Sequence, residues 1–278
     1  MSAANVGRST AGIDDKTWTE LEEIAARYPE KRSGLLPMLH LVQSVEGRVT
    51  PEGIEACADI LGISAADVSG VATFYTMYKR RSVGDYHVGV CTNTLCAVMG
   101  GDAILARLRD HLGVGNDETA EKRDGDAATV SLEHVECNAA CDYAPVMMVN
   151  WEFMDNMTPE SAVQLVDDLR AGQEVHSTRG PRLCTWREAE RVLAGYPDDL
   201  ADEGPAAGPA SLVGLRIARE RGWTAPSAEA RSGGHDVPAE PGQEQQAAAE
   251  AGSKDSESAV VEQHSDSDET AAEKEEGQ

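Results

Sequence analysis

Apolar residues recur at spacings of three and four between Asp15 and Val71, which is the period that places side chains on one face of an α-helix. Breaks at Tyr28-Pro29, Glu46-Gly47 and Gly62 divide this pattern into four stretches, because proline and glycine interrupt helices. The inward-facing positions of these stretches are Trp18, Leu21, Ile24 and Ala25; Leu36, Leu39, Val42 and Val45; Ile54, Cys57, Ala58 and Leu61; and Val68 and Val71. The pattern predicts a four-helix domain at residues 14–80.

After residue 80 the pattern changes, and short apolar runs typical of strands alternate with helical stretches. The predicted order is a strand at 86–90, a helix at 97–112, a strand from 129, a strand pair at 146–150 and 152–154, and a last helix at 159–171. This β-α-β-β-α order predicts a small mixed sheet with helices packed against it, at residues 81–173. Val135 and Cys137 are out of register with the apolar positions before them, so we expect a bend or bulge before Cys137.

The C-terminal third of the chain differs from both predicted domains. Residues 174–225 contain two short basic, amphipathic segments, which we interpret as an extension that lies on a partner protein. Residues 226–278 have almost no large apolar residue and are dominated by Ala, Glu, Ser, Gln, Gly and Pro. Such a segment cannot bury enough apolar surface to offset its ordering entropy, so an acidic, disordered tail is predicted. Residues 1–13 are expected to be flexible.

The charge balance limits the classes of partner. The formal net charge is -25, from 24 basic and 49 acidic residues. A surface this acidic argues against binding nucleic acid, and also against adhesion to anionic lipid. No apolar run reaches the roughly 20 residues that a membrane-spanning helix needs, so direct membrane insertion is not expected. The first residues lack the pattern of a secretory signal peptide, which favours a cytoplasmic location.

Four of the six cysteines form two close pairs, Cys91 with Cys96 and Cys137 with Cys141. Two such pairs from separate loops are typical of a metal centre with four thiolate ligands. The spacing alone leaves three interpretations open: a [2Fe–2S] cluster, structural zinc, or disulfide bonds. Disulfide bonds are the least favoured of the three, because the expected compartment is reducing.

Three other residues have the chemistry of ligands but lack suitable neighbours in the sequence. Cys57 lies on the apolar face of a predicted helix, and is interpreted as a small buried thiol. Cys184 is unpaired and is not expected to be a fifth ligand, and His40 is interpreted as a core-edge or surface histidine. No Gly-rich phosphate loop follows a strand, so the chain is not expected to bind NADH or FMN by itself.

The motifs around the cysteine pairs resemble the thioredoxin-like [2Fe–2S] ferredoxins, and more closely the NuoE family of NADH-quinone oxidoreductase subunits in respiratory complex I. The resemblance extends over about residues 18–172, with its motifs in the same order. One departure is the pair Asn138 and Ala139, where many relatives carry Leu-Gly. The motifs are Val90-Cys91-Thr92-Asn93 with Cys96; Gly100-Gly101; Glu136-Cys137; Ala140-Cys141; Ala144-Pro145-Val146-Met147; Val149-Asn150; the run from Val71 to Tyr78; and Tyr28-Pro29 with Leu36-Pro37 through Gln43.

The resemblance implies an α+β protein, with an N-terminal helical bundle followed by a thioredoxin-like [2Fe–2S] ferredoxin domain and the acidic tail. It implies one [2Fe–2S] cluster held by four metal ligands, Cys91, Cys96, Cys137 and Cys141. The chain is then an electron carrier, and an enzyme only as a subunit of a translocating oxidoreductase. FMN and NADH are expected in an adjacent flavoprotein subunit, among other subunits of the peripheral arm. That complex places the chain on the cytoplasmic face of the inner membrane.

Two alternatives to complex I remain open from the sequence. A diaphorase-type [2Fe–2S] subunit of a soluble NAD-linked hydrogenase or formate dehydrogenase has nearly the same motifs. A zinc-stabilised interaction module without a redox role fits the cysteine spacing but not the wider motifs.

Overall fold

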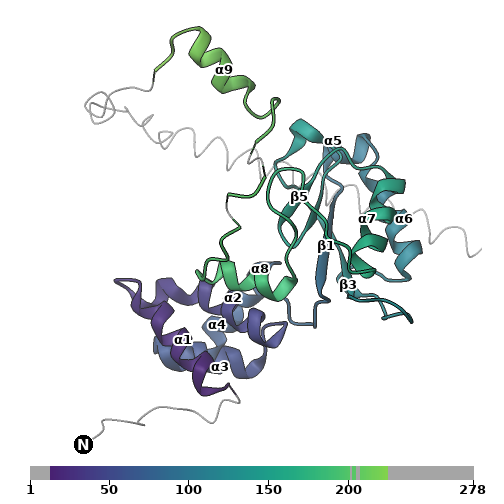
Figure 1. The fold of residues 1–278 in the computed structure, drawn as a ribbon. Coiled ribbons are helices and arrows are strands. Elements are labelled where there is room, and N and C mark those ends of the chain that lie inside the picture. Colours follow the sequence, from purple (N-terminus) through teal and green to yellow (C-terminus); the bar gives the residue numbers. More distant parts are fainter. Residues whose placement is uncertain (1–12, 201, 205–206, 225–278) are drawn as a thin grey trace, which may run out of the picture. The chain divides into compact units, whose positions relative to one another are not determined.

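A computed structural model describes residues 13–200, 202–204 and 207–224 (Figure 1). The chain divides into two compact units, Met1–Gly214 and Leu215–Gln278, and helix α9 (Val213–Glu220) crosses the boundary between them. The predicted acidic tail at residues 226–278 lies outside the described residues. All but the last residue of the predicted flexible N-terminus also lies outside them.

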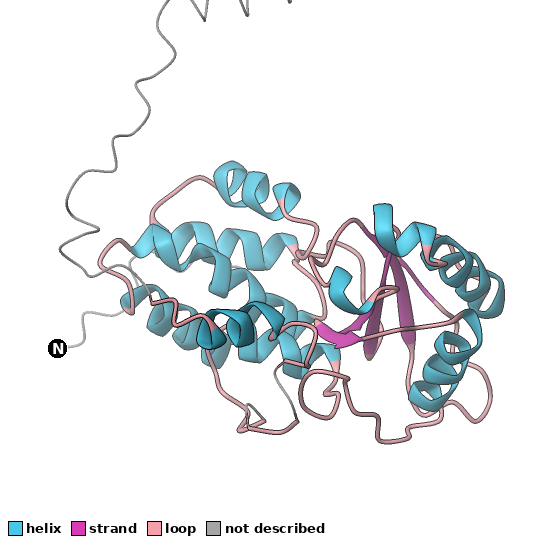
Figure 2. Ribbon diagram, turned by 90° about the horizontal axis from the view of Figure 1, so that it is seen from above, coloured by secondary structure: helices cyan, strands magenta, loops and turns pink. Residues whose placement is uncertain are grey.

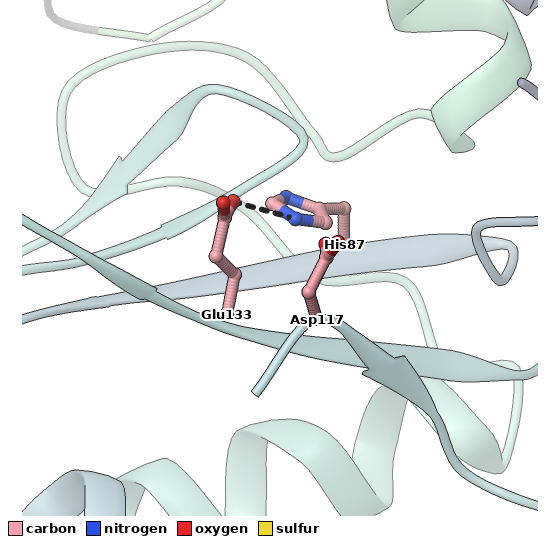
Figure 3. Close-up of side chains that lie close together, drawn as sticks. All are labelled: His87, Asp117 and Glu133. Carbon is pink, nitrogen blue, oxygen red and sulfur yellow. Dashed lines mark ion pairs between the residues drawn. The ribbon is translucent and has the colours of Figure 1, made fainter. Parts of the chain in front are cut away.

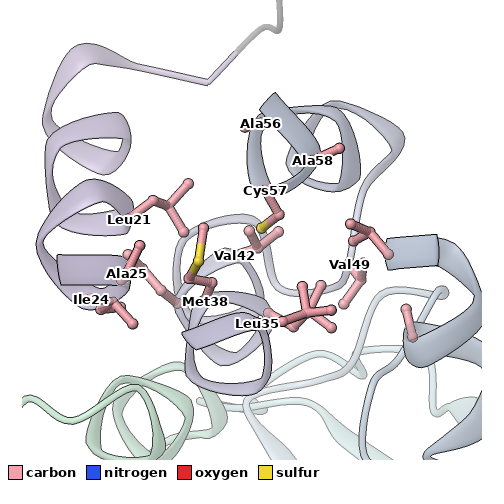
Figure 4. Packing of buried hydrophobic residues seen from close by; sticks show 14 of the residues in the cluster. Leu21, Ile24, Ala25, Leu35, Met38, Val42, Val49, Ala56, Cys57 and Ala58 are labelled. Atoms are coloured by element: carbon pink, nitrogen blue, oxygen red, sulfur yellow. The ribbon is translucent and has the colours of Figure 1, made fainter. Parts of the chain in front are cut away.

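Four α-helices occupy the region in which the hydrophobic pattern predicted them. They are α1 (Asp15–Ala26), α2 (Leu35–Glu46), α3 (Pro51–Leu61) and α4 (Ala65–Phe74), with a short 3-10 helix η1 (Lys31–Gly34) before α2. Their apolar faces meet in one core, in which Leu21, Met38, Val42 and Cys57 have no exposed surface (Figure 4). Burial of these faces stabilises helices that would be marginal in isolation at this length.

The ends of these helices follow from local chemistry. Asp14 accepts a hydrogen bond from the backbone N–H of Thr17 at 2.7 Å, and Thr50 accepts one from Gly53 at 3.1 Å. These contacts satisfy N–H groups that have no partner within the first turn of a helix. Gly62 ends α3 in the left-handed conformation at φ 66°, which glycine adopts without strain.

The second part of the chain forms a five-stranded sheet in the order β2-β3-β1-β4-β5. Strands β1 and β3 are parallel, and the remaining neighbours are antiparallel. Helices α6 and α7 lie side by side and pack against the sheet (Figures 1 and 2). The bounds are β1 (Tyr86–Cys91), β2 (Glu118–Thr119), β3 (Val130–Val135), β4 (Met147–Val149), β5 (Glu152–Met154), α6 (Gly101–Leu112) and α7 (Pro159–Arg170).

Three details differ from the sequence-based expectation. The helix predicted at 97–112 is broken into α5 (Thr94–Val98) and α6, because Gly100 adopts φ 115° between them. A bend or bulge was expected before Cys137, but strand β3 ends at Val135 and Cys137 lies in the loop that follows it. The two-residue strand β2 was not predicted, since two residues carry no periodic signal.

Part of the C-terminal extension packs on its own chain. Helix α8 (Trp186–Leu193) lies against α2, with Trp186 1% exposed and Glu190 fully buried. Contact with a partner protein therefore remains a proposal for the exposed part of residues 174–225. His40, expected at the core edge or surface, is buried beneath this helix.

Within the described residues, no single helix combines the length and the apolarity needed to cross a membrane. Helices α3 and α4 meet those criteria only when taken together, as a pair bent by 120°.

Candidate iron–sulfur site

The two cysteine pairs emerge at the same end of the parallel strands β1 and β3. Cys91 is the last residue of β1 and lies opposite Val135, the last residue of β3. The loop that carries Cys137 therefore leaves the sheet beside Cys91, and the Cys91 thiol donates a hydrogen bond to the Glu136 carbonyl oxygen at 3.1 Å. Strand pairing thus brings together loops that are 45 residues apart in the sequence.

The remaining two thiols lie in the short elements that follow these strands. Cys96 is within α5, and Cys141 opens the 3-10 helix η2 (Cys141–Tyr143). Burial raises the pKa of the Cys96 thiol to about 11; the backbone N–H of Val146 lowers it, and Cys91 and Cys141 raise it further. Cys96 therefore interacts with one thiol from its own pair and with one from the other pair.

The four thiols differ in exposure. Cys91 and Cys96 are each 2% exposed, whereas Cys137 and Cys141 are exposed. All four are free thiols, and the backbone N–H of Ala139 donates to the Cys137 sulfur at 3.4 Å. The site thus has a buried half on β1 and α5 and an open half on the loop after β3.

A close backbone approach at this site requires a glycine. A Cβ atom on Gly101 would lie 2.5 Å from the Cys91 carbonyl oxygen and 2.9 Å from that of Cys96. These distances are shorter than any tolerated contact, so no other residue fits at position 101 without movement of the first cysteine loop. Gly101 holds the chain of α6 against both ligands of the first pair.

The surroundings of Cys91 and Cys96 are apolar. Ala140, Ala144 and Val146 are buried around Cys91 and Cys96, with Val135 and Phe153 packed against them. The peptide bond between Ala144 and Pro145 is cis. Four thiols, backbone N–H groups directed at Cys96 and Cys137, and an apolar covering over Cys91 and Cys96 are features that iron–sulfur clusters use in proteins. The residues present therefore fit a [2Fe–2S] cluster.

Among the described residues, one further group of potential ligand atoms lies within 4.8 Å of one another, and it is formed by His87, Asp117 and Glu133. These three side chains lie close together (Figure 3), and Lys79 pairs with both carboxylates of this group. Lys79 Nζ lies 2.7 Å from Glu133 Oε1 and 3.1 Å from Asp117 Oδ1, with its side chain 4% exposed. His87 Nε2 lies 3.0 Å from Glu133 Oε2, but the two groups are not oriented for a hydrogen bond. We interpret this group as an ion network that joins residues after α4 to the sheet.

The charge state of Glu133 follows from that network. Burial raises the pKa of Glu133, but the contacts with His87 and Lys79 outweigh it, so that pKa lies below its ordinary value of 4.5. Glu133 is therefore an anion that balances the Lys79 ammonium. No local sequence pattern signals this network, because its members are spread from residue 79 to residue 133.

The other two cysteines lie apart from the candidate site. Cys57 is in the core of the four-helix domain, where burial raises the pKa of its thiol to about 12. Cys184 is half-buried, and its carbonyl oxygen accepts a hydrogen bond from Asn150. Neither thiol belongs to the residues packed around Cys91 and Cys96.

Comparisons with known proteins show what this chain is similar to. Residues 21–170 match the family model for thioredoxin-like [2Fe–2S] ferredoxins. The chain is 58% identical over 208 residues to the E subunit of NADH-quinone oxidoreductase from Mycobacterium tuberculosis, a match that covers 74% of this chain and 81% of that protein. It is 35% identical over 176 residues to NADH-quinone oxidoreductase subunit 2 of Thermus thermophilus, covering 62% and 94%. A crystal structure of an NAD⁺-reducing [NiFe]-hydrogenase covers 50% of this chain and 23% of its own, with a TM-score of 0.43 and 15% identity.

Proposed function

Because this chain belongs to the thioredoxin-like [2Fe–2S] ferredoxins, and among them to the NuoE family of NADH-quinone oxidoreductase subunits, we propose that it carries one [2Fe–2S] cluster on Cys91, Cys96, Cys137 and Cys141. The chain is an electron-transfer subunit of an oxidoreductase. The observation that carries the ligand assignment is the meeting of both cysteine pairs at one end of β1 and β3, where Cys96 interacts with Cys91 and Cys141.

When bound, the cluster supplies a group that takes up and returns one electron. The residues of this chain hold it and control its surroundings. The N–H groups of Val146 and Ala139 point to Cys96 and Cys137, and such donors stabilise negative charge on thiolate sulfur. The apolar covering around Cys91 and Cys96 excludes water from the buried half, which leaves the exposed Cys137 and Cys141 half as the side open to solvent.

NADH and FMN belong in this proposal to a partner flavoprotein subunit, and this chain meets that subunit through its own surface. Phe74 is 78% exposed at the end of α4, and its ring packs edge-on against Tyr75, which is 39% exposed. Large aromatic side chains at exposed positions are typical of contact sites between proteins. The complex holds the chain at the cytoplasmic face of the membrane, and other peripheral subunits complete the path for electrons.

The relatives from Mycobacterium tuberculosis and Thermus thermophilus also bear on the choice between quinone-linked and soluble enzymes. Both are named as subunits of NADH-quinone oxidoreductase, at 58% and 35% identity. These identities support complex I rather than a diaphorase of a soluble hydrogenase or formate dehydrogenase.

Iron and acid-labile sulfide analysis with EPR spectroscopy, on anaerobically purified full-length protein, tests the proposal. We expect two irons and two sulfides per chain, and an EPR signal only after reduction with dithionite. Replacing Cys91, Cys96, Cys137 or Cys141 by alanine is expected to abolish the signal. The matched controls Cys57→Ala and Cys184→Ala are expected to keep it. If protein kept free of oxygen contains one zinc per chain and no iron, the result contradicts the proposal and indicates a structural module.

A further inference from the structure

We propose that Arg179, in the C-terminal extension, is a positioning residue that fastens the second cysteine loop and raises the reduction potential of the cluster. The proposal rests on the cluster assignment above, and it concerns a residue outside the matched family region of residues 21–170.

The guanidinium group of Arg179 contacts the residues on both sides of Cys141. One terminal nitrogen donates to Asp142 Oδ1 at 3.0 Å and approaches the Ala140 carbonyl oxygen at 3.5 Å. The side chain of Arg179 is only 14% exposed, although it comes from a segment expected to lie on a partner protein. A positive charge is thus held directly beside one of the proposed ligands.

The same guanidinium group is anchored to the sheet. Arg179 Nε donates to Asp155 Oδ2 at 2.8 Å, and a terminal nitrogen donates to Asp155 Oδ1 at 2.9 Å. Asp155 directly follows β5, and its side chain is 8% exposed. A bidentate contact of this kind fixes both the position and the plane of the arginine. Arg179 therefore ties the exposed half of the site to a strand of the sheet.

Two aromatic rings also contact the Arg179 guanidinium group. The Arg179 guanidinium lies 5.0 Å from the ring centroid of Tyr143 and 5.0 Å from that of Phe153. Tyr143 belongs to η2, which begins with Cys141, and Phe153 is part of the apolar covering of Cys91 and Cys96. The arginine thus interacts with both halves of the candidate site. A lysine could keep the charge but not the planar contacts.

A second segment of the extension contacts the same loop. The backbone N–H of Ala210 donates to the Tyr143 hydroxyl oxygen at 3.1 Å, and Ser211 Oγ donates to the Asp142 carboxylate. Gly208 lies so close to the Tyr143 hydroxyl that a Cβ atom there would collide with it. Arg179 and residues 208–211 therefore contact η2 from two separate parts of the extension.

The sign of the electrostatic effect follows from charge. Reduction adds one negative charge to a cluster that is already anionic through its four thiolates. Arg179 opposes this negative charge, and it also balances the carboxylates of Asp142 and Asp155. Loss of Arg179 leaves those two carboxylates uncompensated beside the cluster, so the reduced form is disfavoured and the reduction potential falls.

The test is the midpoint potential of the purified full-length holoprotein, followed by the EPR signal of the reduced cluster in a redox titration. We expect Arg179→Gln to lower the potential, Arg179→Lys to recover part of the shift, and Asp142→Asn to raise the potential. Arg182→Gln is the matched control, because Arg182 lies in the same segment and pairs at 3.3 Å with Glu203 rather than with the cysteine loop. We expect no shift for this control.

The outcomes separate the two proposals. Equal potentials for wild type, Arg179→Gln and Asp142→Asn, each with a full complement of iron, would overturn the role of Arg179 and leave the cluster assignment intact. Absence of iron from wild type would instead refute the function itself. If Arg179→Gln does not fold, Arg179→Lys and Asp142→Asn decide the question, because opposite shifts in these two variants support the proposal and unchanged potentials refute it.

Discussion

Glu190 of α8 and His40 of α2 meet in the interior of the protein, with 2.6 Å between Glu190 Oε2 and His40 Nδ1. Glu190 has no exposed surface, and it also accepts hydrogen bonds from Gln43 Nε2 at 2.7 Å and Trp151 Nε1 at 3.2 Å. One carboxylate therefore joins the four-helix domain, the β4–β5 turn and the C-terminal extension. The extension is thus part of the folded core at this point.

Replacing Glu190 by alanine is expected to destabilise the protein strongly. The change leaves His40, Gln43 and Trp151 without their shared acceptor in a buried site, which typically costs about 3 to 5 kcal/mol. Glu190→Gln retains one acceptor oxygen and should cost less. Urea unfolding followed by circular dichroism under anaerobic conditions measures both, with Glu174→Ala at an exposed position as the control. A Glu190→Ala variant as stable as the control would show that the buried contacts of Glu190 do not contribute to the free energy of unfolding.

The buried thiol of Cys57 predicts a loss of stability at alkaline pH. Burial raises the pKa of this thiol from its ordinary value of 9.0 to about 12, so the folded state keeps a proton that the unfolded state releases. Its contribution is complete below pH 9 and decreases as the pH rises from 9 towards 12. At about pH 10.5 the loss amounts to about 2 kcal/mol, since one pKa unit corresponds to about 1.4 kcal/mol.

The measurement compares urea unfolding of wild type and Cys57→Ala at about pH 8 and about pH 10.5, on either side of the ordinary thiol pKa. The variant loses packing at both pH values, but it lacks the ionisable group, so its stability should fall less between them. Equal decreases in the two proteins would mean that Cys57 ionises as readily when folded as when unfolded.

Gly101→Ala is expected to prevent normal cluster binding. The added methyl group would collide with the carbonyl oxygens of Cys91 and Cys96 and displace both ligands of the first pair. Gly70→Ala is the matched control, because Gly70 lies in α4 with nothing within 4 Å of its added Cβ. That control should stabilise the protein by about 1 kcal/mol through helix propensity. Iron content and visible absorbance distinguish the variants, and a fully loaded Gly101→Ala protein would refute the steric argument.

The sequence was most informative where neighbouring residues determine the structure. The four helices, the strand that ends at Cys91 and both cysteine pairs are all local patterns, since spacing and capping residues lie within a few positions of each other. The four proposed ligands were found in the same way. Their place at one end of β1 and β3 follows from the parallel pairing of these two strands, which the predicted order of elements did not specify.

The sequence was least informative about contacts between distant segments. Glu190 looks like an ordinary surface residue of a short helix, because nothing near it in the sequence reveals His40, 150 positions earlier. Arg179 likewise lies in a segment rich in glycine and proline, and its role depends on Asp142 and Asp155 from another part of the fold. Interpretation of residues 174–225 as a partner-binding arm missed these contacts because composition describes exposure only on average.

The exposed aromatic pair at the end of α4 yields a final prediction about assembly. Phe74 is 78% exposed and is not part of the helical core, so Phe74→Ser should leave the unfolding midpoint and the iron content unchanged. Binding to the flavoprotein subunit should weaken by about tenfold or more, because a central aromatic anchor commonly contributes about 2 kcal/mol or more. Co-purification and titration with the flavoprotein subunit measure this, with Val98→Ser as the control at a similarly exposed apolar position on α5. If only Val98→Ser weakens binding, the contact with the flavoprotein subunit lies on the face beside Cys96 instead. If neither variant weakens binding, neither surface contacts that subunit.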